Sequence, residues 1–260
     1  MTPLVSIITP SYNQARFLEQ TIQSVLSQDY PDKEYIIVDG GSTDGSVEII
    51  KRYFSQLAWW VSESDRGQTD AINKGFAHAK GEIFAWLNSD DTYQPGAITQ
   101  AVEFLLTHPT VALVYGNANL VDEQGKIIGR FPARKTNLRK LLHGSVHIPQ
   151  QATFFRSRFW KQVGPLDPTF QFAMDYDLWV RLAKLAPLLY VPRLWANFRL
   201  HGEGKSVTMD DRCYPEMMRV YQREGGGRIS LLSARWLLRR MLYAWLPLRL
   251  RVKLRRFFNR

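Results

Sequence analysis

The sequence predicts an α/β fold in which a mixed, largely parallel sheet is flanked by helices, with a basic amphipathic helical tail at its end. Short apolar segments recur early in the chain, and a polar loop follows each of them: residues 5–9, 34–38, 58–61 and 82–87. Helix-like spacing of apolar residues follows the first three loops. Strand, loop, helix and next strand, in that order, give parallel pairing with right-handed crossovers, so these loops should meet at one edge of one sheet.

The first two strands each lead through a polar loop into a predicted helix. Residues 5–9 are followed by the loop 10–14, and residues 34–38 by the loop 39–46. The positions expected to face the sheet then recur every three or four residues. They are Phe17, Thr21, Ile22, Val25 and Leu26 after the first loop, and Val47, Ile50, Tyr53 and Phe54 after the second.

The third and fourth strands complete the predicted edge. Residues 58–61 lead to the polar loop 62–70 and to a helix-like segment at 71–76, whereas residues 82–87 end in Asn88, Ser89, Asp90 and Asp91. In open α/β sheets the ligand crevice lies beyond the carboxyl ends of the strands. Carboxylates placed there can hold Mg²⁺ or Mn²⁺ against phosphate oxygens. The alternative is that the same residues form a turn and cap the next helix.

Seven motifs occur in order between residues 4 and 208: SIITPSYNQ, EYIIVDGGSTDGS, SESDRGQTDAINKG, WLNSDD, PQQATFF, MDYDLWVRL and FRLHGEGKS. In this order they resemble the family 2 glycosyltransferases, whose GT-A fold is a Rossmann-like nucleotide-sugar-binding domain. The resemblance implies a catalytic domain over residues 1–224, with a nucleotide-binding half at about 1–115 and an acceptor half at about 116–224. It also implies transfer of a sugar from a nucleoside-diphosphate donor, UDP- or dTDP-linked, to a hydroxyl of a glycan or lipid-linked acceptor.

The resemblance assigns the donor site to the loops of the first four strands. Asp39 can accept the imide N–H of a pyrimidine, although Asp39 capping its own turn is the alternative. Tyr12 could stack on the base or only pack within its loop. The residues that the resemblance places at the nucleotide or donor sugar are Pro10, Tyr12, Asp39, Asp65, Asp70, Lys74, Asn88 and Ser89.

The metal motif departs from the Asp-x-Asp pattern of the family, because Asn88 occupies its first position. By position, Asp90 is then the residue expected on a Mn²⁺ or Mg²⁺ ion, with diphosphate oxygens and waters completing its shell. His201 matches the family's C-terminal histidine, which can be a further ligand, and imidazole suits Mn²⁺ better than Mg²⁺. A structural or surface role for His201 is the alternative.

A second acidic pair opens a predicted helix whose apolar positions are Leu178, Leu182 and Leu185. The pattern places Asp175 at the exposed start of this helix, where an acidic residue can also simply meet the helix dipole. By resemblance, Asp175 is the general base that takes the acceptor's proton, and a single base implies inversion at the anomeric carbon. Asp177 is expected to fix the helix start or an acceptor hydroxyl. The acceptor site is expected to include His147, Gln150, Gln151 and Asp177.

Composition favours a cytoplasmic enzyme. Cys213 is the only cysteine among 260 residues, which excludes an internal disulfide and a thiolate zinc cluster. Residues 1–3 lead almost directly into a strand, so no signal peptide is expected.

Charge is concentrated at the end of the chain. The net charge is +10, and residues 228–260 hold ten Arg and Lys residues and no acid. Residues 225–227 are three glycines that we expect to form a hinge before this tail. Basic amphipathic helices fit an anionic membrane surface, which would place the enzyme peripherally on the cytoplasmic face of the inner or plasma membrane. Docking to a partner protein is the alternative, and no nucleic-acid partner is expected, because the rest of the chain is balanced in charge. A nucleotidyltransferase or a non-catalytic nucleotide-sugar-binding protein of the same fold is the alternative function.

Overall fold

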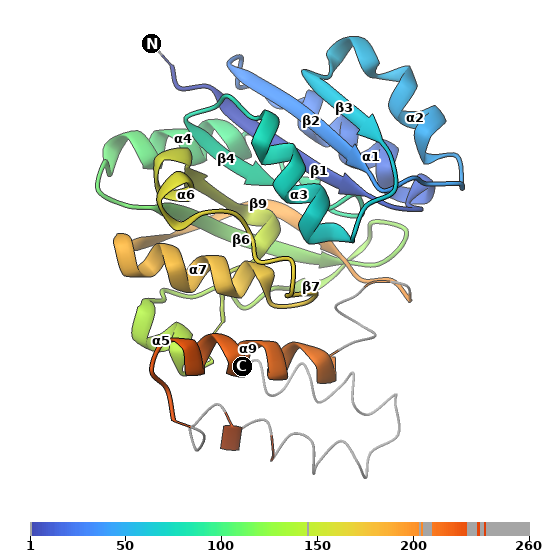
Figure 1. The fold of residues 1–260 in the computed structure, drawn as a ribbon. Coiled ribbons are helices and arrows are strands. Elements are labelled where there is room, and N and C mark those ends of the chain that lie inside the picture. Colours follow the sequence, from blue (N-terminus) through green and yellow to red (C-terminus); the bar gives the residue numbers. More distant parts are fainter. Residues whose placement is uncertain are drawn as a thin grey trace.

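A computed structural model describes residues 2–144, 146–202, 204, 210–227, 233, 234 and 237. The predicted basic tail, residues 228–260, therefore lies outside the described residues apart from three positions. Within the described part, the chain forms a nine-stranded sheet in the order β3-β2-β1-β4-β8-β6-β9-β5, with β7 paired to β6 (Figure 1). No helix of this part is both long and apolar enough to cross a bilayer.

The sheet is parallel where the sequence predicts it and mixed beyond. The pairs β1–β2, β2–β3, β1–β4 and β6–β9 are parallel, while β8 joins β4 to β6 by antiparallel pairing. This confirms the predicted fold class. The strands are β1 (Val5–Ser11), β2 (Lys33–Asp39), β3 (Trp59–Ser62), β4 (Ile83–Trp86), β5 (Thr92–Tyr93), β6 (Leu113–Val121), β7 (Ile127–Arg130), β8 (Thr153–Arg156) and β9 (Leu188–Arg199).

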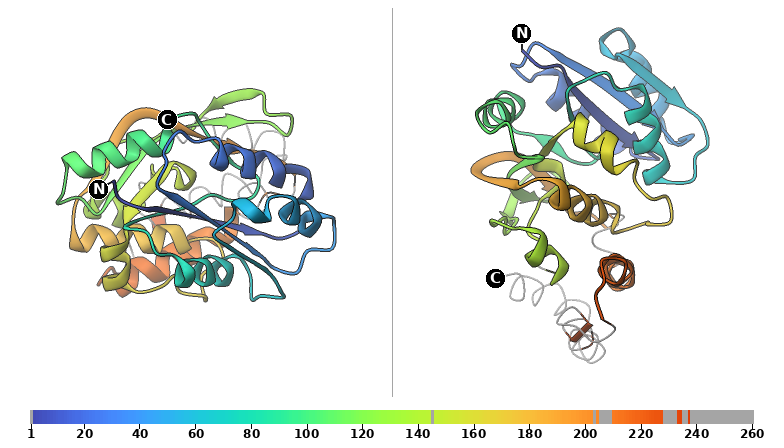
Figure 2. Two further views of the ribbon diagram at one scale, coloured as in Figure 1. Left: turned by 90° about the horizontal axis from the view of Figure 1, so that it is seen from above. Right: turned by 60° about the vertical axis from the view of Figure 1, so that its left-hand side comes forward.

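Helices cover both faces of the sheet (Figures 1 and 2). Buried side chains of α1, α2 and α4 pack on one face, and those of α3, α6 and α7 on the other. The short α5 and the long α9 pack in turn against α7. The helices are α1 (Ala15–Leu26), α2 (Ser46–Arg52), α3 (Gln68–His78), α4 (Ala97–Thr107), α5 (Leu138–Leu142), α6 (Ser157–Val163), α7 (Met174–Leu185) and α9 (Asp210–Arg223), with 3-10 turns at Phe54–Gln56 and Gln150–Ala152.

Two predicted apolar positions are wrong in detail. Phe54 lies beyond the end of α2 in a 3-10 turn and is exposed, because α2 ends at Arg52. Leu185 is also exposed, at the last turn of α7, whereas Leu178 and Leu182 are fully buried as expected. Both misplaced residues sit at helix ends, where the helical spacing no longer determines which side chains face the core.

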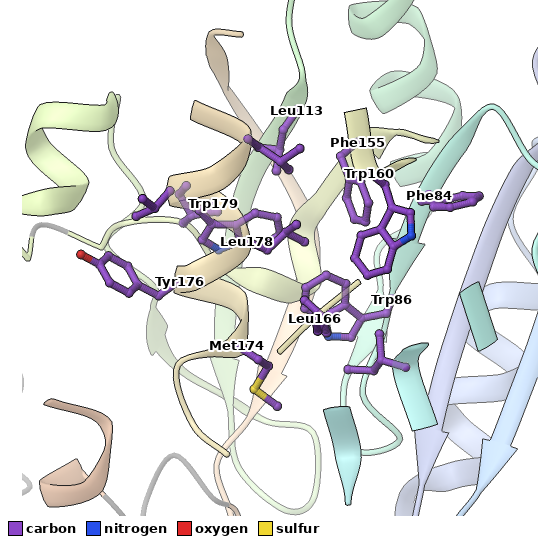
Figure 3. Packing of buried hydrophobic residues seen from close by; sticks show 14 of the residues in the cluster. Phe84, Trp86, Leu113, Phe155, Trp160, Leu166, Met174, Tyr176, Leu178 and Trp179 are labelled. Carbon is purple, nitrogen blue, oxygen red and sulfur yellow. The ribbon is translucent and has the colours of Figure 1, made fainter. Parts of the chain in front are cut away.

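An aromatic cluster connects β4 to α7 (Figure 3). The rings of Trp86 and Trp179 stack with centroids 5.6 Å apart and planes 18° apart, and Phe155 packs edge-on against both. Trp86 closely precedes the polar loop after β4, and Trp179 lies one helical turn beyond Asp175. Rigid aromatic rings in close contact constrain the elements that carry them. The core therefore fixes the position of the loop after β4 relative to the start of α7.

Candidate active site

A cavity of about 780 Å³ lies at the carboxyl ends of β1 and β4, which is the edge predicted from the sequence. Its walls come from the loops after the first four strands, the segment before β8, the start of α7, the end of β9 and one side of α9. This volume is in the range of small-molecule and cofactor sites. The predicted site residues that line it are Pro10, Tyr12, Asp65, Asn88, Ser89, Asp90, Gln150, Gln151, Asp175 and His201.

Five predicted site residues do not line the cavity: Asp39, Asp70, Lys74, His147 and Asp177. Asp70 accepts hydrogen bonds from the backbone and guanidinium of Arg66 at 3.2 Å, in the first turn of α3. Lys74 forms an ion pair with Glu63 at 2.6 Å. His147 is likewise not among the lining residues, although its neighbours Val146 and Ile148 are.

Asp39 is completely buried at the end of β2 and does not line the cavity. Its carboxylate accepts hydrogen bonds from the backbone N–H groups of Gly41 and Ser42 and from the hydroxyls of Ser42 and Ser62, at 2.5 to 3.1 Å. These are the contacts of a residue that shapes its own turn. A role at the nucleotide base remains a prediction, and it requires the base to replace one of these partners. Gly40, the next residue, does line the cavity.

Asp177 lies in the first turn of α7, but it does not line the cavity with the other predicted acceptor residues Gln150 and Gln151. Its side chain is 1% exposed and forms ion pairs with Arg181 at 2.8 Å and with Arg223 at 2.6 Å. Asp177 follows Tyr176, the last residue of α7 that lines the cavity. Its carboxylate joins α7 to Arg223 in α9. In this arrangement, the carboxylate of Asp177 does not reach an acceptor hydroxyl in the cavity.

Asp90 and His201 approach each other where the loop after β4 meets the end of β9. The Nε2 atom of His201 is 2.9 Å from Oδ2 of Asp90. This is the distance of a direct hydrogen bond between the two side chains, which a cation bound by both would have to replace. Among the described residues, no group of three or more His, Cys, Asp and Glu is placed to hold a metal. A metal here would need oxygens of the donor and water to complete its shell.

Arg199, which the sequence did not single out, holds the loop that carries Asp90. Its guanidinium donates to the backbone oxygen of Asp90 at 2.9 Å and to Gln20 at 2.7 Å, and its backbone N–H donates to Asp91 at 2.9 Å. Burial, reinforced by the charge of Asp90, raises the pKa of Asp91 well above its ordinary value. The loop is thus held by buried groups on β9, over a hundred residues away in sequence.

Gln68 is a second residue that the sequence analysis missed. Its side-chain amide donates to Oδ1 of Asn88 at 2.7 Å, which joins the start of α3 to the loop after β4. Gln68 lies within the motif SESDRGQTDAINKG, so its presence near the site could have been inferred, but not its partner. The bond orients the residue that replaces the first aspartate of the metal motif.

Asp175 lies at the first turn of α7, partly buried rather than at an exposed start as predicted. Burial raises the pKa of its carboxyl to about 6, and the nearby charge of Glu216 adds to the increase, while the backbone N–H of Tyr176 opposes it with a hydrogen bond at 2.6 Å. A carboxylate with a pKa close to neutral is suited to take up a proton at neutral pH.

Comparison with known proteins identifies the class. The profile of the family described as Glycosyl transferase family 2 matches residues 6–163, so the chain belongs to this family. It is 34% identical over 236 residues to an uncharacterized glycosyltransferase of Mycobacterium tuberculosis, covering 88% of each chain. It is 31% identical over 224 residues to an uncharacterized glycosyltransferase of Rickettsia felis, of which it spans only 36%. The chain is thus a glycosyltransferase.

Solved structures show the same fold. S. aureus TarS 1-349, in complex with UDP-GlcNAc, aligns with a TM-score of 0.69 at 18% identity, over 84% of this chain and 65% of that one. The mannosyltransferase PcManGT from Pyrobaculum calidifontis, in complex with GDP-Man and Mn²⁺, aligns with a TM-score of 0.66 at 21% identity, over 92% of this chain and 70% of that one. These similarities confirm the GT-A fold that the sequence predicts.

Proposed function

We propose that this protein is a metal-dependent inverting glycosyltransferase, which moves a sugar from a UDP- or dTDP-sugar to a hydroxyl of a glycan or lipid-linked acceptor. The observation that carries the proposal is a single cavity that has Asp90 and His201 on one wall and Asp175 on another. One wall offers ligands for a charged diphosphate and its cation, and the other offers a proton acceptor. Transfer of a sugar needs both functions at once.

The donor diphosphate would lie against the loop after β4. Asp90 and His201 would hold a Mn²⁺ or Mg²⁺ ion there, and Asn88, oriented by Gln68, offers a neutral oxygen beside them. When bound, such an ion neutralises charge on the departing diphosphate. The mannosyltransferase that shares the fold was crystallised with Mn²⁺, which supports this choice of cofactor.

The nucleoside would extend from the diphosphate toward the ends of β1 and β2. Tyr12 is 62% exposed at the cavity, so its ring is free to stack on a base. Pro10, Ser11 and Gly40 line the same wall, and Asp65 lies across from Gly40. A pyrimidine is supported by the UDP-GlcNAc complex of TarS, although GDP-Man in PcManGT shows that the fold also takes a purine.

Asp175 would act on the acceptor. In the transfer step, the acceptor oxygen attacks the anomeric carbon, the bond from that carbon to the diphosphate breaks, and Asp175 takes the hydroxyl proton. Its pKa of about 6 leaves it mostly ionised at neutral pH and basic enough to accept a proton. One such base supports a single displacement with inversion. Gln150 and Gln151 lie on the cavity wall, where they could contact the donor sugar or the acceptor.

The acceptor and the cellular location remain proposals that depend on the tail. Ten cations in residues 228–260 would hold the enzyme at the anionic cytoplasmic face of a membrane, where a lipid-linked acceptor is available.

The experiment that tests the proposal is a donor screen with purified protein. UDP-, dTDP- and GDP-sugars are offered with Mn²⁺, with Mg²⁺ and with EDTA, and both nucleoside diphosphate and pyrophosphate are measured. We expect metal-dependent release of a nucleoside diphosphate from a UDP- or dTDP-sugar. Release of pyrophosphate would favour a nucleotidyltransferase, and binding of the donor without turnover would favour a non-catalytic sugar-nucleotide-binding protein.

A further inference from the structure

Helix α9 contributes a carboxylate that binds the backbone just before Asp175. Glu216 accepts hydrogen bonds from three consecutive N–H groups, those of Gln171 at 2.9 Å, Phe172 at 2.9 Å and Ala173 at 2.8 Å. Ala173 is the residue that immediately precedes α7, and no side chain caps this helix from within its own loop. Glu216 thus binds the three backbone N–H groups that lead into the helix, and not those of its first turn, which an N-terminal cap normally binds.

The segment that Glu216 holds forms part of the cavity wall. Gln171, Phe172 and Met174 line the cavity together with Asp175. The same helix holds the residues just before them, because Arg219 donates to the hydroxyl of Thr169 at 2.9 Å and lies 4.3 Å from the ring centre of Phe170. The backbone oxygen of Phe170 in turn accepts from Thr69 in α3, at 2.9 Å. Residues 169–173 therefore connect the donor-side helix α3 to α9 and end at the proposed base.

We propose that Glu216 is a positioning residue for sugar transfer, which fixes the segment before α7 and so places the carboxylate of Asp175 against the acceptor hydroxyl. This inference rests on the proposed function of Asp175. Glu216 itself does not line the cavity, whereas Cys213 and Met217, on either side of it in the helix, do. It therefore acts on the reaction through the backbone that it binds and not by touching the substrate.

The charge of Glu216 also affects the ionisation of the Asp175 carboxyl group. As a neighbouring anion it disfavours the ionised form of Asp175, in addition to the larger effect of burial. The other ionisable groups on the cavity walls are Tyr12, Asp65, Asp90, Tyr176, Arg199, His201 and Cys213. Of these residues only Tyr176 affects the pKa of Asp175, through its backbone N–H and not through a charge, so Glu216 is the charged neighbour whose removal should be seen in the pH profile.

The test compares Glu216→Gln with the wild-type full-length chain. One amide oxygen cannot replace two carboxylate oxygens for three donors, so at least one backbone N–H loses its partner. We expect kcat to fall on the order of 10- to 100-fold, as for a small misplacement of a reacting group, with donor KM unchanged. The acid limb of the kcat profile should move to lower pH, because the repelling charge is gone. Glu216→Asp keeps the charge and should leave that limb in place while lowering kcat.

Glu224→Gln is the matched control. Glu224 follows α9 directly and pairs with Lys184 near the far end of α7 at 2.6 Å, but no hydrogen bond joins it to residues 171–173. It should retain wild-type kcat and pH dependence. A folded Glu216→Gln protein with unchanged kcat and an unchanged acid limb would overturn the proposal. Hydrogen exchange of the amides at 171–173, expected to accelerate in Glu216→Gln, is read without substrate, so it separates this inference from the proposed function.

Discussion

The two walls of the cavity are constructed in different ways. On the donor side, the functional side chains lie within a few residues of the strand that positions them, and Asp39 and Asp65 hold their own loops with short-range hydrogen bonds. On the acceptor side, Asp175 depends on contacts that join distant segments: α9 through Glu216, and β4 through the stacked pair Trp86 and Trp179. The proposed donor wall takes most of its side chains from the ends of consecutive strands, although His201 and Arg199 join it from β9, whereas the proposed acceptor wall depends on contacts of α7 with α9 and β4.

This difference predicts which property of the enzyme a substitution in each wall should change. A change in a donor loop should affect binding of the nucleotide or the cation. A change at the start of α7 should affect the rate of transfer with little effect on the donor. The predictions below test this separation, beginning with the largest effect.

Asp175→Asn should lower kcat by roughly 10²- to 10⁴-fold, the usual contribution of a general base, because an amide cannot take the acceptor's proton. Binding of the donor should be nearly unchanged. Steady-state kinetics with calorimetry of donor binding measures both quantities. A variant within a few-fold of wild type would mean that another group accepts the proton.

Asp90→Asn should lower turnover on the order of 10²-fold or more, because an amide binds less tightly than a carboxylate to the cation that neutralises the diphosphate. EDTA should reproduce the loss in the wild-type enzyme, and circular dichroism should show an intact fold. Glu224→Gln, at a residue that does not line the cavity, is the control and should retain most activity. Full activity of the wild type in metal-free buffer would exclude this role of Asp90.

Asp39→Ala should weaken binding of a pyrimidine nucleoside diphosphate by about 1 to 3 kcal/mol, if the base exchanges with one of the present partners of the carboxylate. Asp44→Ala is the matched control, because Asp44 also shapes the turn through Ala15 and Ser46 but has no proposed contact with the base. Calorimetric titration of the nucleoside diphosphate distinguishes the two variants. Equal affinities for UDP in Asp39→Ala and wild type would leave Asp39 with its structural role alone.

Asp175→Asn should also stabilise the fold near neutral pH. The folded pKa of about 6 lies above the ordinary value of 3.8 for an aspartate, so the contribution of Asp175 to stability falls as the pH rises from about 4 to about 6. At about 1.4 kcal/mol per unit, the variant gains at most about 3 kcal/mol at pH 7 and nothing below pH 4.

Chemical denaturation at both pH values measures this difference. Asp177→Asn is the opposite control, because Asp177 lies between two arginines and its replacement should destabilise the protein. Equal stability of Asp175→Asn and wild type at pH 7 and at pH 4 would show that Asp175 is not kept from ionising by burial.

The tail should have the smallest effect on the chemistry. Truncation before Arg228 should leave transfer to a soluble acceptor unchanged but abolish binding to anionic liposomes, since each cation contributes up to about 1 kcal/mol at such a surface. Neutral liposomes are the control. Wild-type protein that stays in solution beside anionic liposomes at low salt would favour docking to a partner protein instead.

The sequence predicted most of the strands and loops of the proposed donor side because their signals are contiguous. Apolar strands followed by polar loops and by helically spaced apolar residues predicted β1 to β4 and the edge where they meet. The cavity is lined by Tyr12, Asn88 and Asp90, as expected. Even there, Asp39 was found buried in its own turn, because hydrogen bonds with Ser62 on β3 depend on the folded sheet.

The acceptor side could be predicted only in part. The acidic start of α7 was visible, but the burial that raises the pKa of Asp175 arises from packing against other elements. Glu216 has no local signature, since it binds backbone groups more than 40 positions away; the same holds for Arg199, which holds the Asp90 loop on the other wall. The buried carboxylate of Asp177 pairs with Arg223 because of the position of α9, which the sequence pattern did not reveal.

The most direct test of separate donor and acceptor walls is calorimetric titration of the nucleoside diphosphate of the preferred donor, with and without Mn²⁺, into three proteins. Wild type and Asp175→Asn should bind it with equal affinity and equal enhancement by Mn²⁺, whereas Asp90→Asn should lose the enhancement. An Asp90→Asn protein that keeps the full Mn²⁺ effect, or an Asp175→Asn protein that loses it, would contradict the account.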